Sequence, residues 1–511
     1  MVNIVKTASV VGINAYEVSV ETDVVNSLPG MAIVGLPDTS VTESRDRVKS
    51  AIKNSGYTFP SRKVVVNLAP ADLKKVGTSF DLPIAVGILI EEEVLNSQQV
   101  EDYAFIGELS LDGTIRAVPG VLPLVLGLKN AGIKNVIVPE SNAKEAALNA
   151  GINVYGAQHL TDVVNHFTQN KLSAVQVDVK DYLSRMYNQD YTFDFKSVKG
   201  QSKAKKALEI AAAGGHNVIM TGSPGSGKTL MAKCFASILP PLELEEALEL
   251  TKIYSICGLL SADEPLMTKR PFRSVHHTAS ANGIIGGGST PKPGEITLAN
   301  RGVLFLDEMT EFPRQILEVL RQPLEDGEIV ISRAKHSIKY PAKFMLLGAM
   351  NPCPCGFLGD KEKMCTCTDF QINRYRAKLS GPLLDRIDIQ IDVPRLTPAE
   401  LLATKEDEQD SKTIRNRVIK ARQIQAKRYV NDGVLTNSEL TPALIKKYCQ
   451  IDEKSKELMK VAIVKYQLSG RKYDRVLKLA RTIADLDDSE NISQNHLMQA
   501  LQYKMDFNNE Q

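Results

Sequence analysis

The segment from residue 222 to residue 229 has the composition and spacing of a phosphate-binding loop. It follows the pattern G-x-x-x-x-G-K-[ST] with Gly222, Ser223, Pro224, Gly225, Ser226, Gly227, Lys228 and Thr229. The glycines let the backbone curl so that its N–H groups point at an anion. The lysine would reach the β- and γ-phosphates of a nucleotide, and the threonine hydroxyl would bind Mg²⁺. We expect a strand at 217–220 before this phosphate loop and a helix from Lys228 after it.

An acid pair, Asp307 and Glu308, ends the apolar run 303–306. Downstream of a phosphate loop, an acid at a strand end holds the Mg²⁺, directly or through water, and this is the role predicted for Asp307. Glu308 is then the natural general base, because it can polarise the attacking water. Solvated acid pairs are common on surfaces, but not at the end of an apolar strand in this context. The two motifs together predict an ATPase that uses Mg²⁺.

The whole chain has the composition of an ordinary globular protein. It has 511 residues, of which 43% are hydrophobic and 24% charged, and its net charge is +2. This length predicts roughly three domains. No apolar run approaches the ~20 residues of a membrane span, and the N-terminus lacks the apolar stretch of a signal peptide. We therefore expect a cytoplasmic protein without a membrane partner, whereas the small net charge neither requires nor excludes a nucleic-acid partner.

The chain has 7 cysteines, and four of them cluster. Three are isolated, as is typical of buried thiols: Cys234, Cys257 and Cys449. The other four form two C-x-C pairs, Cys353 with Cys355 and Cys365 with Cys367. In a cytosolic chain such a cluster favours a metal over disulfides, and two pairs could close a tetrahedral zinc site. Thiols without a metal are the alternative, because the spacing is tighter than the usual C-x-x-C.

Residues 1–168 have the pattern of a mixed α/β domain. Strand-like apolar runs lie at 16–21, 32–36, 64–68 and 135–138. Helical periods lie between them, at about 39–55, 80–93, 119–131 and 142–150. Neither a nucleotide loop nor a cluster of metal-binding residue types occurs in this part of the sequence.

This first region resembles the proteolytic domain of the Lon family. The segment 77–79 (Gly-Thr-Ser) heads a helix where Lon has its nucleophilic serine, and residues 105–139 match later Lon strands. Lon activates its serine with a lysine, but around the corresponding place this chain has residues 119–123, which contain none. A serine without a base is a weak nucleophile. The resemblance implies a Lon-protease-like α+β domain that is proteolytically inactive and serves oligomer assembly or the binding of an unidentified partner.

Three regions follow. Residues 169–192 are polar, which predicts a linker with a short helix. Residues 193–395 contain both nucleotide motifs. Residues 396–511 carry helical periods at 398–407, 411–427, 441–448, 452–467, 471–487 and 493–503. Residues 195–201 resemble the start of an AAA+ module, in which a Gly-Gln pair borders the adenine pocket and a helix follows, here at 202–213. This resemblance implies an α/β fold, with an AAA+ P-loop core built on a parallel sheet and a C-terminal helical lid.

Details of the core resemble one clade of AAA+ proteins. The 78 positions between Thr229 and Asp307 exceed the separation in simple AAA+ modules. The segments that carry the resemblance are 270–278, 286–288, 293–308, 351–356 and 379–388. They are similar to the magnesium-chelatase-like clade, and most closely to the ComM/YifB family, which also shares the order of the domains.

The ComM/YifB resemblance implies roles for individual residues. Asn351 takes the sensor-1 role, in which a strand-end amide orients the attacking water, although a turn residue before a proline is the alternative. Arg386 takes the role of an arginine finger that reaches the γ-phosphate of a neighbouring subunit, unless it only pairs with a nearby aspartate. Arg471 matches the sensor-2 position, with Arg475 one turn later as the alternative. A finger that acts on a neighbour implies a ring, and the family forms hexamers.

Residues 327–340 look like a hairpin before the sensor strand. In related helicases this hairpin projects into the pore of the ring, so Lys335, His336 and Lys339 would face DNA phosphates. A solvated turn is the alternative. The pair His276–His277 could bind metal or line the pore, and a plain insert loop explains it equally well.

The resemblance as a whole implies an ATP-driven hexameric motor on single-stranded or branched DNA. ComM-like proteins are branch-migration helicases that promote the integration of incoming DNA in natural transformation and homologous recombination. A chelatase-like motor is one alternative, but chelatase ATPase subunits lack a protease-like domain. A remodeller of protein partners is another, and the sequence does not exclude it.

Overall fold

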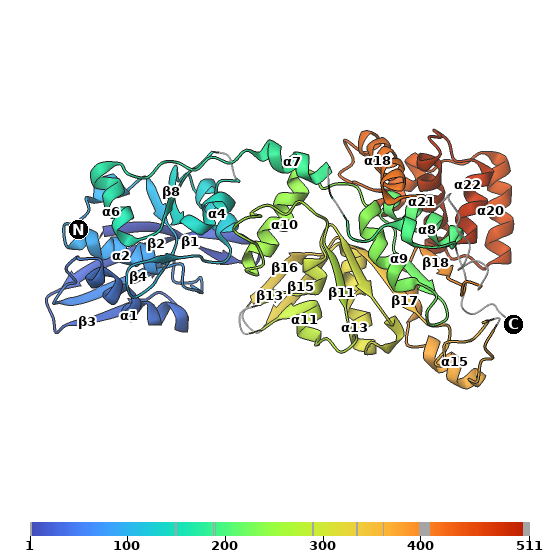
Figure 1. Cartoon of the computed structure of the whole chain (residues 1–511), viewed down its shortest axis with the longest axis horizontal. Helices are drawn as coiled ribbons and strands as arrows, with labels where there is room; N and C mark the ends of the chain where they lie inside the picture. Colours follow the sequence, from blue (N-terminus) through green and yellow to red (C-terminus); the bar gives the residue numbers. More distant parts are fainter. Residues whose placement is uncertain are drawn as a thin grey trace. The chain divides into compact units, whose positions relative to one another are not determined.

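The computed structural model describes residues 3–148, 151–187, 189, 191–288, 291–333, 336–360, 362–397 and 409–503. The chain folds into two compact units (Figure 1). Unit 1 comprises Met1–Tyr187 together with Glu243–Thr268, and unit 2 comprises Asn188–Leu242 together with Lys269–Gln511. The backbone therefore passes from one unit to the other three times. Within the described part of the chain, no helix has the length and apolar character required to cross a bilayer.

Unit 1 is built on a sheet of seven strands in the order β3-β4-β2-β1-β5-β8-β9. β2 pairs antiparallel with β1 and with β4, while the other neighbouring pairs are parallel. The strands are β1 (Asn3–Val11), β2 (Asn14–Val25), β3 (Gly30–Val34), β4 (Lys63–Ala69), β5 (Tyr103–Phe105), β8 (Asn135–Pro139) and β9 (Asn153–Ala157). The principal helices are α1 (Thr39–Asn54), α2 (Asp81–Glu91), α4 (Val121–Asn130), α5 (Ala143–Ala146) and α6 (Leu160–Gln169).

The four strands and the first three helices predicted for this region are confirmed, because their apolar patterns reflect burial. The helix predicted at about 142–150 is shorter in the structure, where α5 ends at Ala146, and residues 149–150 lie outside the described residues. In β4 the residues Val64, Val66 and Leu68 are buried and their neighbours are less so, as expected where one face of a sheet covers a core. α2 carries the apolar run from Leu82 to Ile90 and is buried on all sides. The short helix predicted in the linker is α7 (Val179–Tyr187).

The residues that resemble the Lon site can now be placed. Ser79 precedes α2 and is 8% exposed. Lys75, the lysine closest to it in sequence, is fully buried and its ammonium group donates a hydrogen bond to the carbonyl of Pro70. This lysine is therefore engaged with the backbone. The likeness to Lon and the loss of proteolytic activity stay predictions.

A segment of the predicted nucleotide core folds with unit 1 instead. α10 (Leu244–Ile256) follows the phosphate-loop helix in sequence, yet it packs against α4. The Gly120 amide donates to the Ser255 carbonyl at 2.9 Å, and the Ser255 hydroxyl donates to the buried carboxylate of Glu145. Residues 243–268 are thus an integral part of unit 1. The division of the sequence into regions 1–168, 169–192, 193–395 and 396–511 did not include this excursion.

Unit 2 contains a five-stranded sheet in the order β11-β14-β17-β10-β18, in which every neighbouring pair is parallel. The strands are β10 (Val218–Thr221), β11 (Phe272–Val275), β14 (Val303–Leu306), β17 (Met345–Met350) and β18 (Ile389–Asp392). Every residue of β10, β14 and β17 is buried, which explains their continuous apolar sequences. This is the predicted α/β fold with a parallel sheet. The loops after these strands meet at one edge of the sheet, as parallel strands require.

The chain after the sheet is helical, as predicted for a lid. Its helices are α18 (Ser411–Arg428), α19 (Pro442–Tyr448), α20 (Glu453–Lys465), α21 (Gly470–Leu486) and α22 (Gln494–Gln502). Within residues 409–503 the only strand-like pairing is an isolated bridge. α8 (Ser202–Gly214) packs against both α18 and α21, so the sheet and the lid share one hydrophobic core (Figure 1). The helix predicted at 398–407 lies outside the described residues.

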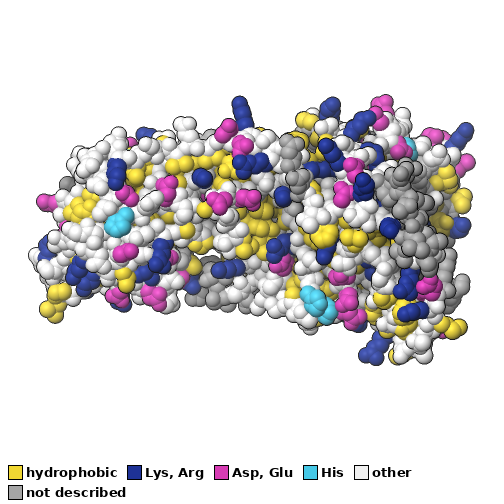
Figure 2. Space-filling model, in the orientation of Figure 1, with side chains coloured by type: hydrophobic (Ala, Val, Ile, Leu, Met, Phe, Trp, Pro, Cys, Tyr) yellow, Lys and Arg dark blue, Asp and Glu magenta, His cyan; other side chains and the backbone are white. Residues whose placement is uncertain are grey.

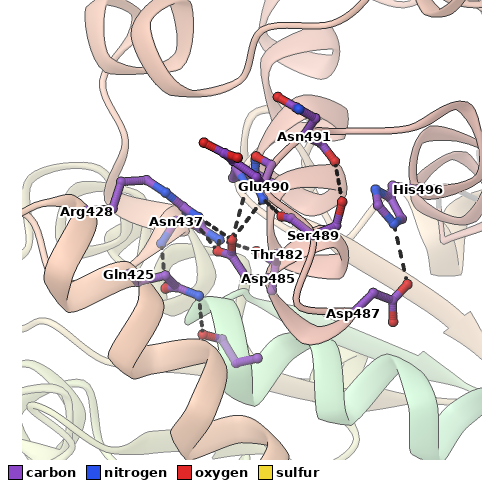
Figure 3. A network of polar contacts seen from close by, with 12 residues as sticks. Gln425, Arg428, Asn437, Thr482, Asp485, Asp487, Ser489, Glu490, Asn491 and His496 are labelled. Carbon is purple, nitrogen blue, oxygen red and sulfur yellow. Dashed lines mark hydrogen bonds and ion pairs between the residues drawn. The ribbon is translucent and has the colours of Figure 1, made fainter.

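The lid is held together by a buried polar network around Asp485 (Figure 3). The Asp485 side chain is 0% exposed and accepts hydrogen bonds from Arg428 at 2.5 and 3.0 Å and from Arg481 at 3.1 Å. Asn437 Nδ2 donates to the same carboxylate at 2.9 Å and to Thr482 Oγ1 at 3.0 Å. One carboxylate therefore ties α18 to α21.

Replacing Asp485 by Asn should destabilise unit 2 strongly. The substitution removes one negative charge and leaves two arginines with uncompensated positive charge in a buried site, which costs about 3–5 kcal/mol of unfolding free energy. Chemical denaturation of the full chain measures this change. The control is Asp488→Asn, because the Asp488 carboxylate is 61% exposed where it pairs with Lys420, and its loss should cost under about 1 kcal/mol. Equal effects of the two substitutions would contradict the prediction.

Candidate nucleotide site and cysteine cluster

The phosphate loop joins β10 to α9 (Lys228–Phe235) at the carboxyl edge of the unit 2 sheet. Gly225 and Gly227 have φ angles of 77° and 91°, a left-handed conformation that side chains disfavour. At Gly222 the constraint is space, because a Cβ atom would lie 2.2 Å from the carbonyl oxygen of Val393. α9 begins directly after the loop, with Gly227 as its N-cap residue and no side-chain cap, so its first amides are available to an anion. The predicted order of strand, loop and helix is therefore confirmed.

Lys228 is buried inside the loop that it belongs to. Its ammonium group donates to the carbonyls of Gly222 at 2.6 Å and Ser223 at 3.0 Å. Ser226 Oγ and Asn351 Oδ1 each lie 3.4 Å away. Burial lowers the pKa of Lys228 to about 8, while the acid pair acts in the opposite direction. The proton of this lysine is therefore held more weakly than in water.

This lowered pKa predicts pH-dependent nucleotide binding. Above about pH 8 the unliganded Lys228 is neutral, whereas phosphates favour its charged form, so binding must take up a proton. Nucleotide affinity should fall by about tenfold between pH 7 and pH 9, since one pKa unit corresponds to a tenfold change. Titration of a fluorescent ATP analogue at both pH values measures this. The Lys228→Arg variant stays charged, so its affinity, although weaker, should not change over this range. A pH-independent wild-type affinity would refute the prediction.

The predicted magnesium ligands contact each other. Thr229 Oγ1 donates to Asp307 Oδ2 at 2.8 Å, although the two residues are 78 positions apart. A hydroxyl group and a carboxylate are oxygen ligands of the kind that Mg²⁺ prefers beside phosphates. The structure thus brings the two sequence motifs into one site, and the residues present fit a Mg²⁺ ion.

The side chain of Glu308 lies next to a histidine. Glu308 follows β14 with a φ angle of 49°, and its side chain is 55% exposed. His277 Nδ1 lies 3.5 Å from Glu308 Oε2, and this nitrogen is buried without a hydrogen bond of normal geometry. Among the described residues, the only group of three or more side chains arranged to hold a metal is formed by four cysteines. His277 is therefore a neighbour of Glu308, which the sequence did not reveal.

Asn351 directly follows β17, the strand between β14 and β10. The side-chain oxygen of Asn351 lies 3.4 Å from the ammonium nitrogen of Lys228, so the Asn351 side chain faces the phosphate loop. Four predicted residues of the nucleotide site therefore converge from three neighbouring strand ends: Lys228, Asp307, Glu308 and Asn351.

Arg386 is only 13% exposed and forms an ion pair with Glu325 on α14 (Arg321–Asp326). This carboxylate, rather than a neighbouring aspartate, is its partner. Burial lowers the pKa of Arg386, and the charges of Arg321, Arg471 and Arg475 lower it further. Four arginines thus gather close to one another in unit 2.

The two candidates for sensor 2 differ in their contacts. Arg475 donates to the Ile387 carbonyl at 3.2 Å and lies 3.7 Å from Asp385. Arg471 is exposed in the first turn of α21. Arg475 is therefore engaged within the unit, and the side chain of Arg471 is the more accessible of the two.

The four clustered cysteines lie together, with their sulfur atoms within 4.8 Å of one another. Cys353 Sγ lies 3.4 Å from Cys355 Sγ and 3.6 Å from Cys365 Sγ, and Cys355 and Cys365 are also 3.6 Å apart. The Cys355 amide donates to Cys367 Sγ at 3.3 Å. The isolated thiols Cys234 and Cys449 are buried as predicted, whereas Cys257 is partly exposed.

The predicted hairpin is confirmed as β15 (Glu328–Arg333) and β16 (His336–Pro341), whose register pairs Arg333 with His336. Lys335 lies outside the described residues, and the side chain of His336 is not described either. Lys339 is 67% exposed and pairs with Glu328 at 2.7 Å. The structure therefore supports the hairpin, while contacts of its basic residues with DNA stay a prediction.

Comparison with known families covers nearly the whole chain. Residues 20–142 match the family described as subunit ChlI of Mg-chelatase. Residues 194–401 match the family described as magnesium chelatase, subunit ChlI, and residues 408–504 match that of its C-terminal part.

Individual relatives align over similar lengths. The chain is 42% identical over 504 residues to the uncharacterized protein YifB of Salmonella typhimurium, which covers 98% of this chain and 96% of that protein. It is 41% identical over 503 residues to the competence protein ComM of Haemophilus influenzae, which covers 98% and 97%. The magnesium-chelatase 38 kDa subunit of Rhodobacter capsulatus is 28% identical over 177 residues, or 31% of this chain and 50% of that protein.

Proposed function

Because the chain belongs to the family of YifB and ComM, which are magnesium-chelatase-like proteins, we propose that it is an AAA+ ATPase that drives a motor on DNA. The name of the relative ComM, a competence protein, supports a role in the uptake and recombination of DNA. The specific activity proposed is branch migration, which promotes integration of incoming DNA in natural transformation. Its dependence on ATP is the reason to propose a cytoplasmic location.

One observation carries the ATPase proposal, the convergence of groups from three strand ends on the phosphate loop. Lys228 would neutralise charge on the β- and γ-phosphates. Glu308 would accept a proton from the attacking water, and the Asn351 amide would orient that water. Mg²⁺ bound by Thr229 and Asp307 would supply positive charge to the phosphate oxygens. These residue types in this arrangement favour phosphoryl transfer to water.

The arginines support assembly into a ring. Arg386 is proposed to leave Glu325 and to reach the γ-phosphate bound by a neighbouring subunit, where its fixed charge stabilises the transition state. The exposed Arg471 is proposed as sensor 2, and the engagement of Arg475 with Ile387 and Asp385 supports this choice. A hexamer is the proposed assembly.

Two neighbouring hairpins support contact with DNA. The β15–β16 hairpin lies beside a smaller hairpin, β12 (Gly286–Gly287) with β13 (Lys292–Pro293), and Tyr340 Oη donates to the Pro291 carbonyl at 2.8 Å. On the face drawn in Figure 2, basic and acidic side chains alternate. Contact with DNA is therefore proposed at the hairpin rather than over this face. Local contacts from Lys335, His336 and Lys339 at the hairpin are the proposed means of gripping the phosphates.

The test is ATP hydrolysis with and without single-stranded DNA. We expect DNA to stimulate turnover at low salt and the stimulation to decline as salt rises, because phosphate contacts release counterions. Reversing two hairpin charges in the variant Lys335→Glu/Lys339→Glu should reduce the stimulation by at least about fivefold. The matched control, Lys454→Glu/Lys460→Glu, reverses two exposed lysines on α20 and should keep it.

Two other results would contradict parts of the proposed function. A basal ATPase rate that does not respond to DNA at low salt would refute the DNA motor and favour a remodeller of protein partners, which the chelatase relatives make the second candidate. An equal loss of stimulation in both double variants would refute the role of the hairpin, but not that of DNA.

A further inference from the structure

The cysteine cluster has the dimensions of a zinc site. Four sulfurs around Zn²⁺ at the usual bond length of about 2.3 Å form a tetrahedron with edges of about 3.8 Å. Three of the sulfur–sulfur distances in the cluster are 3.4, 3.6 and 3.6 Å. All four sulfurs lie within 4.8 Å of one another, so one ion could contact every one of them. The residues present therefore fit Zn²⁺, for which four thiolates are a closed, structural ligand set.

The segment that carries the cluster has little else to fix its shape. Between Asn351 and Thr368 the described residues form turns and bends, without a helix or strand. A segment of this kind loses much conformational freedom when it is ordered, and a metal cross-link reduces that loss. The cysteines approach one another from two separate C-x-C pairs, so an ion between them would close a loop.

This segment lies against the phosphate loop. Gly356 has a φ angle of 84°, and a Cβ atom there would lie 2.7 Å from Pro224 Cδ and 3.8 Å from Asn351 Cγ. Asp360 comes near the loop at a second point, because the nearby Ser223 side chain is the largest cause of its lowered pKa, and its oxygen Oδ2 is buried without a hydrogen-bond partner. Gly356 thus packs on Pro224 of the phosphate loop, and Asp360 lies near Ser223.

We propose that the four cysteines bind a zinc ion that braces the phosphate loop, so that loss of the metal weakens nucleotide binding. Zinc fixes the segment 353–367, and Gly356 and Asp360 then hold Pro224 and Ser223 in place. The ion takes no part in the chemistry of hydrolysis. The effect on nucleotide binding rests on the proposed nucleotide site, whereas the binding of zinc by the four cysteines does not.

The first experiment counts zinc in the full chain purified without chelators. We expect about one zinc ion per chain, since four thiolates close one site, and almost none in the variant Cys355→Ser/Cys367→Ser. The control Cys257→Ser, which removes a partly exposed thiol outside the cluster, should keep the ion. Absence of zinc from the wild-type chain, or disulfides among the four cysteines by mass spectrometry, would overturn the metal site.

The second experiment measures the affinity for a fluorescent ATP analogue in the presence of Mg²⁺. The double cysteine variant should bind at least about tenfold more weakly than the wild type. Asp360→Asn keeps all four cysteines, so it should retain zinc but lose about three- to tenfold in affinity. Asp369→Asn, an exposed acid in the first turn of α15 (Asp369–Arg376), is its matched control and should bind normally.

The outcomes separate the brace from the nucleotide site. Normal affinity in both the zinc-free variant and Asp360→Asn would overturn the brace even if zinc is present. If circular dichroism shows that the double cysteine variant misfolds, the nucleotide affinity of Asp360→Asn tests the brace. A wild-type chain that binds zinc but no nucleotide would refute the proposed function and the brace together, and would leave the metal site standing.

Discussion

Glu308→Gln should reduce ATP turnover by at least about a hundredfold while nucleotide affinity stays close to that of the wild type. General base catalysis contributes about 10²–10⁴-fold, and an amide cannot accept the proton of the attacking water. The ammonium group of Lys228 donates to the Gly222 carbonyl, and Thr229 donates to Asp307, so these phosphate and Mg²⁺ groups are held by residues other than Glu308. Turnover is measured by phosphate release, and affinity is measured separately with a fluorescent analogue.

The control for this variant lies three residues further along the chain. Glu311 carries the same charge, is partly exposed and pairs with Lys378 at 3.5 Å. Glu311→Gln should therefore hydrolyse ATP at the wild-type rate. If the two variants lose activity equally, or if Glu308→Gln retains more than about a tenth of the wild-type rate, Glu308 is not the general base.

Arg386→Ala should lower turnover by about a thousandfold or more in the assembled protein. An arginine finger contributes about 10³–10⁵ in kcat, because it stabilises charge that develops in the transition state. The expected loss exceeds what the ion pair with Glu325 could account for, since that carboxylate is 53% exposed and exposed pairs contribute little. Arg374→Ala, which removes an exposed arginine near the end of α15, is the control and should be active.

Mixing two inactive variants tests whether Arg386 acts on a neighbour. A ring that contains both Arg386→Ala and Glu308→Gln subunits has interfaces where a complete site meets an intact Arg386. Such mixtures should regain a measurable fraction of the wild-type turnover, although each variant alone is inactive. If no mixing ratio restores activity while the subunits still assemble together, Arg386 does not act across an interface.

Much of the nucleotide site could be predicted from the sequence, because its parts are local. The phosphate loop is one contiguous segment, and the acid pair and Asn351 each end an apolar strand. Parallel strands end at the same edge of a sheet, so the predicted parallel sheet implied that Lys228, Asp307 and Asn351 lie at one edge, and the strand order seen in the structure makes them neighbours. The spacing of the cysteines likewise predicted their cluster, which the structure confirms as a cluster.

The contacts that the sequence did not reveal join residues that are distant in the chain and common in type. Glu325 pairs with Arg386 across 61 positions, and His277 approaches Glu308 only because β11 lies beside β14. The hydrophobic periodicity of the sequence around an acid or a histidine does not predict which strand end its side chain will face. The same limit applies to α10, since an amphipathic pattern predicts a helix but not the domain that the helix packs against.

The excursion of residues 243–268 into unit 1 limits how this protein can be divided. A truncation that removes the chain before residue 188 would leave α10 without α4, the helix against which it packs. The N-terminal unit therefore cannot be removed as one continuous segment of the chain. A deletion at a single junction would not remove it cleanly, because residues 243–268 would remain within the ATPase.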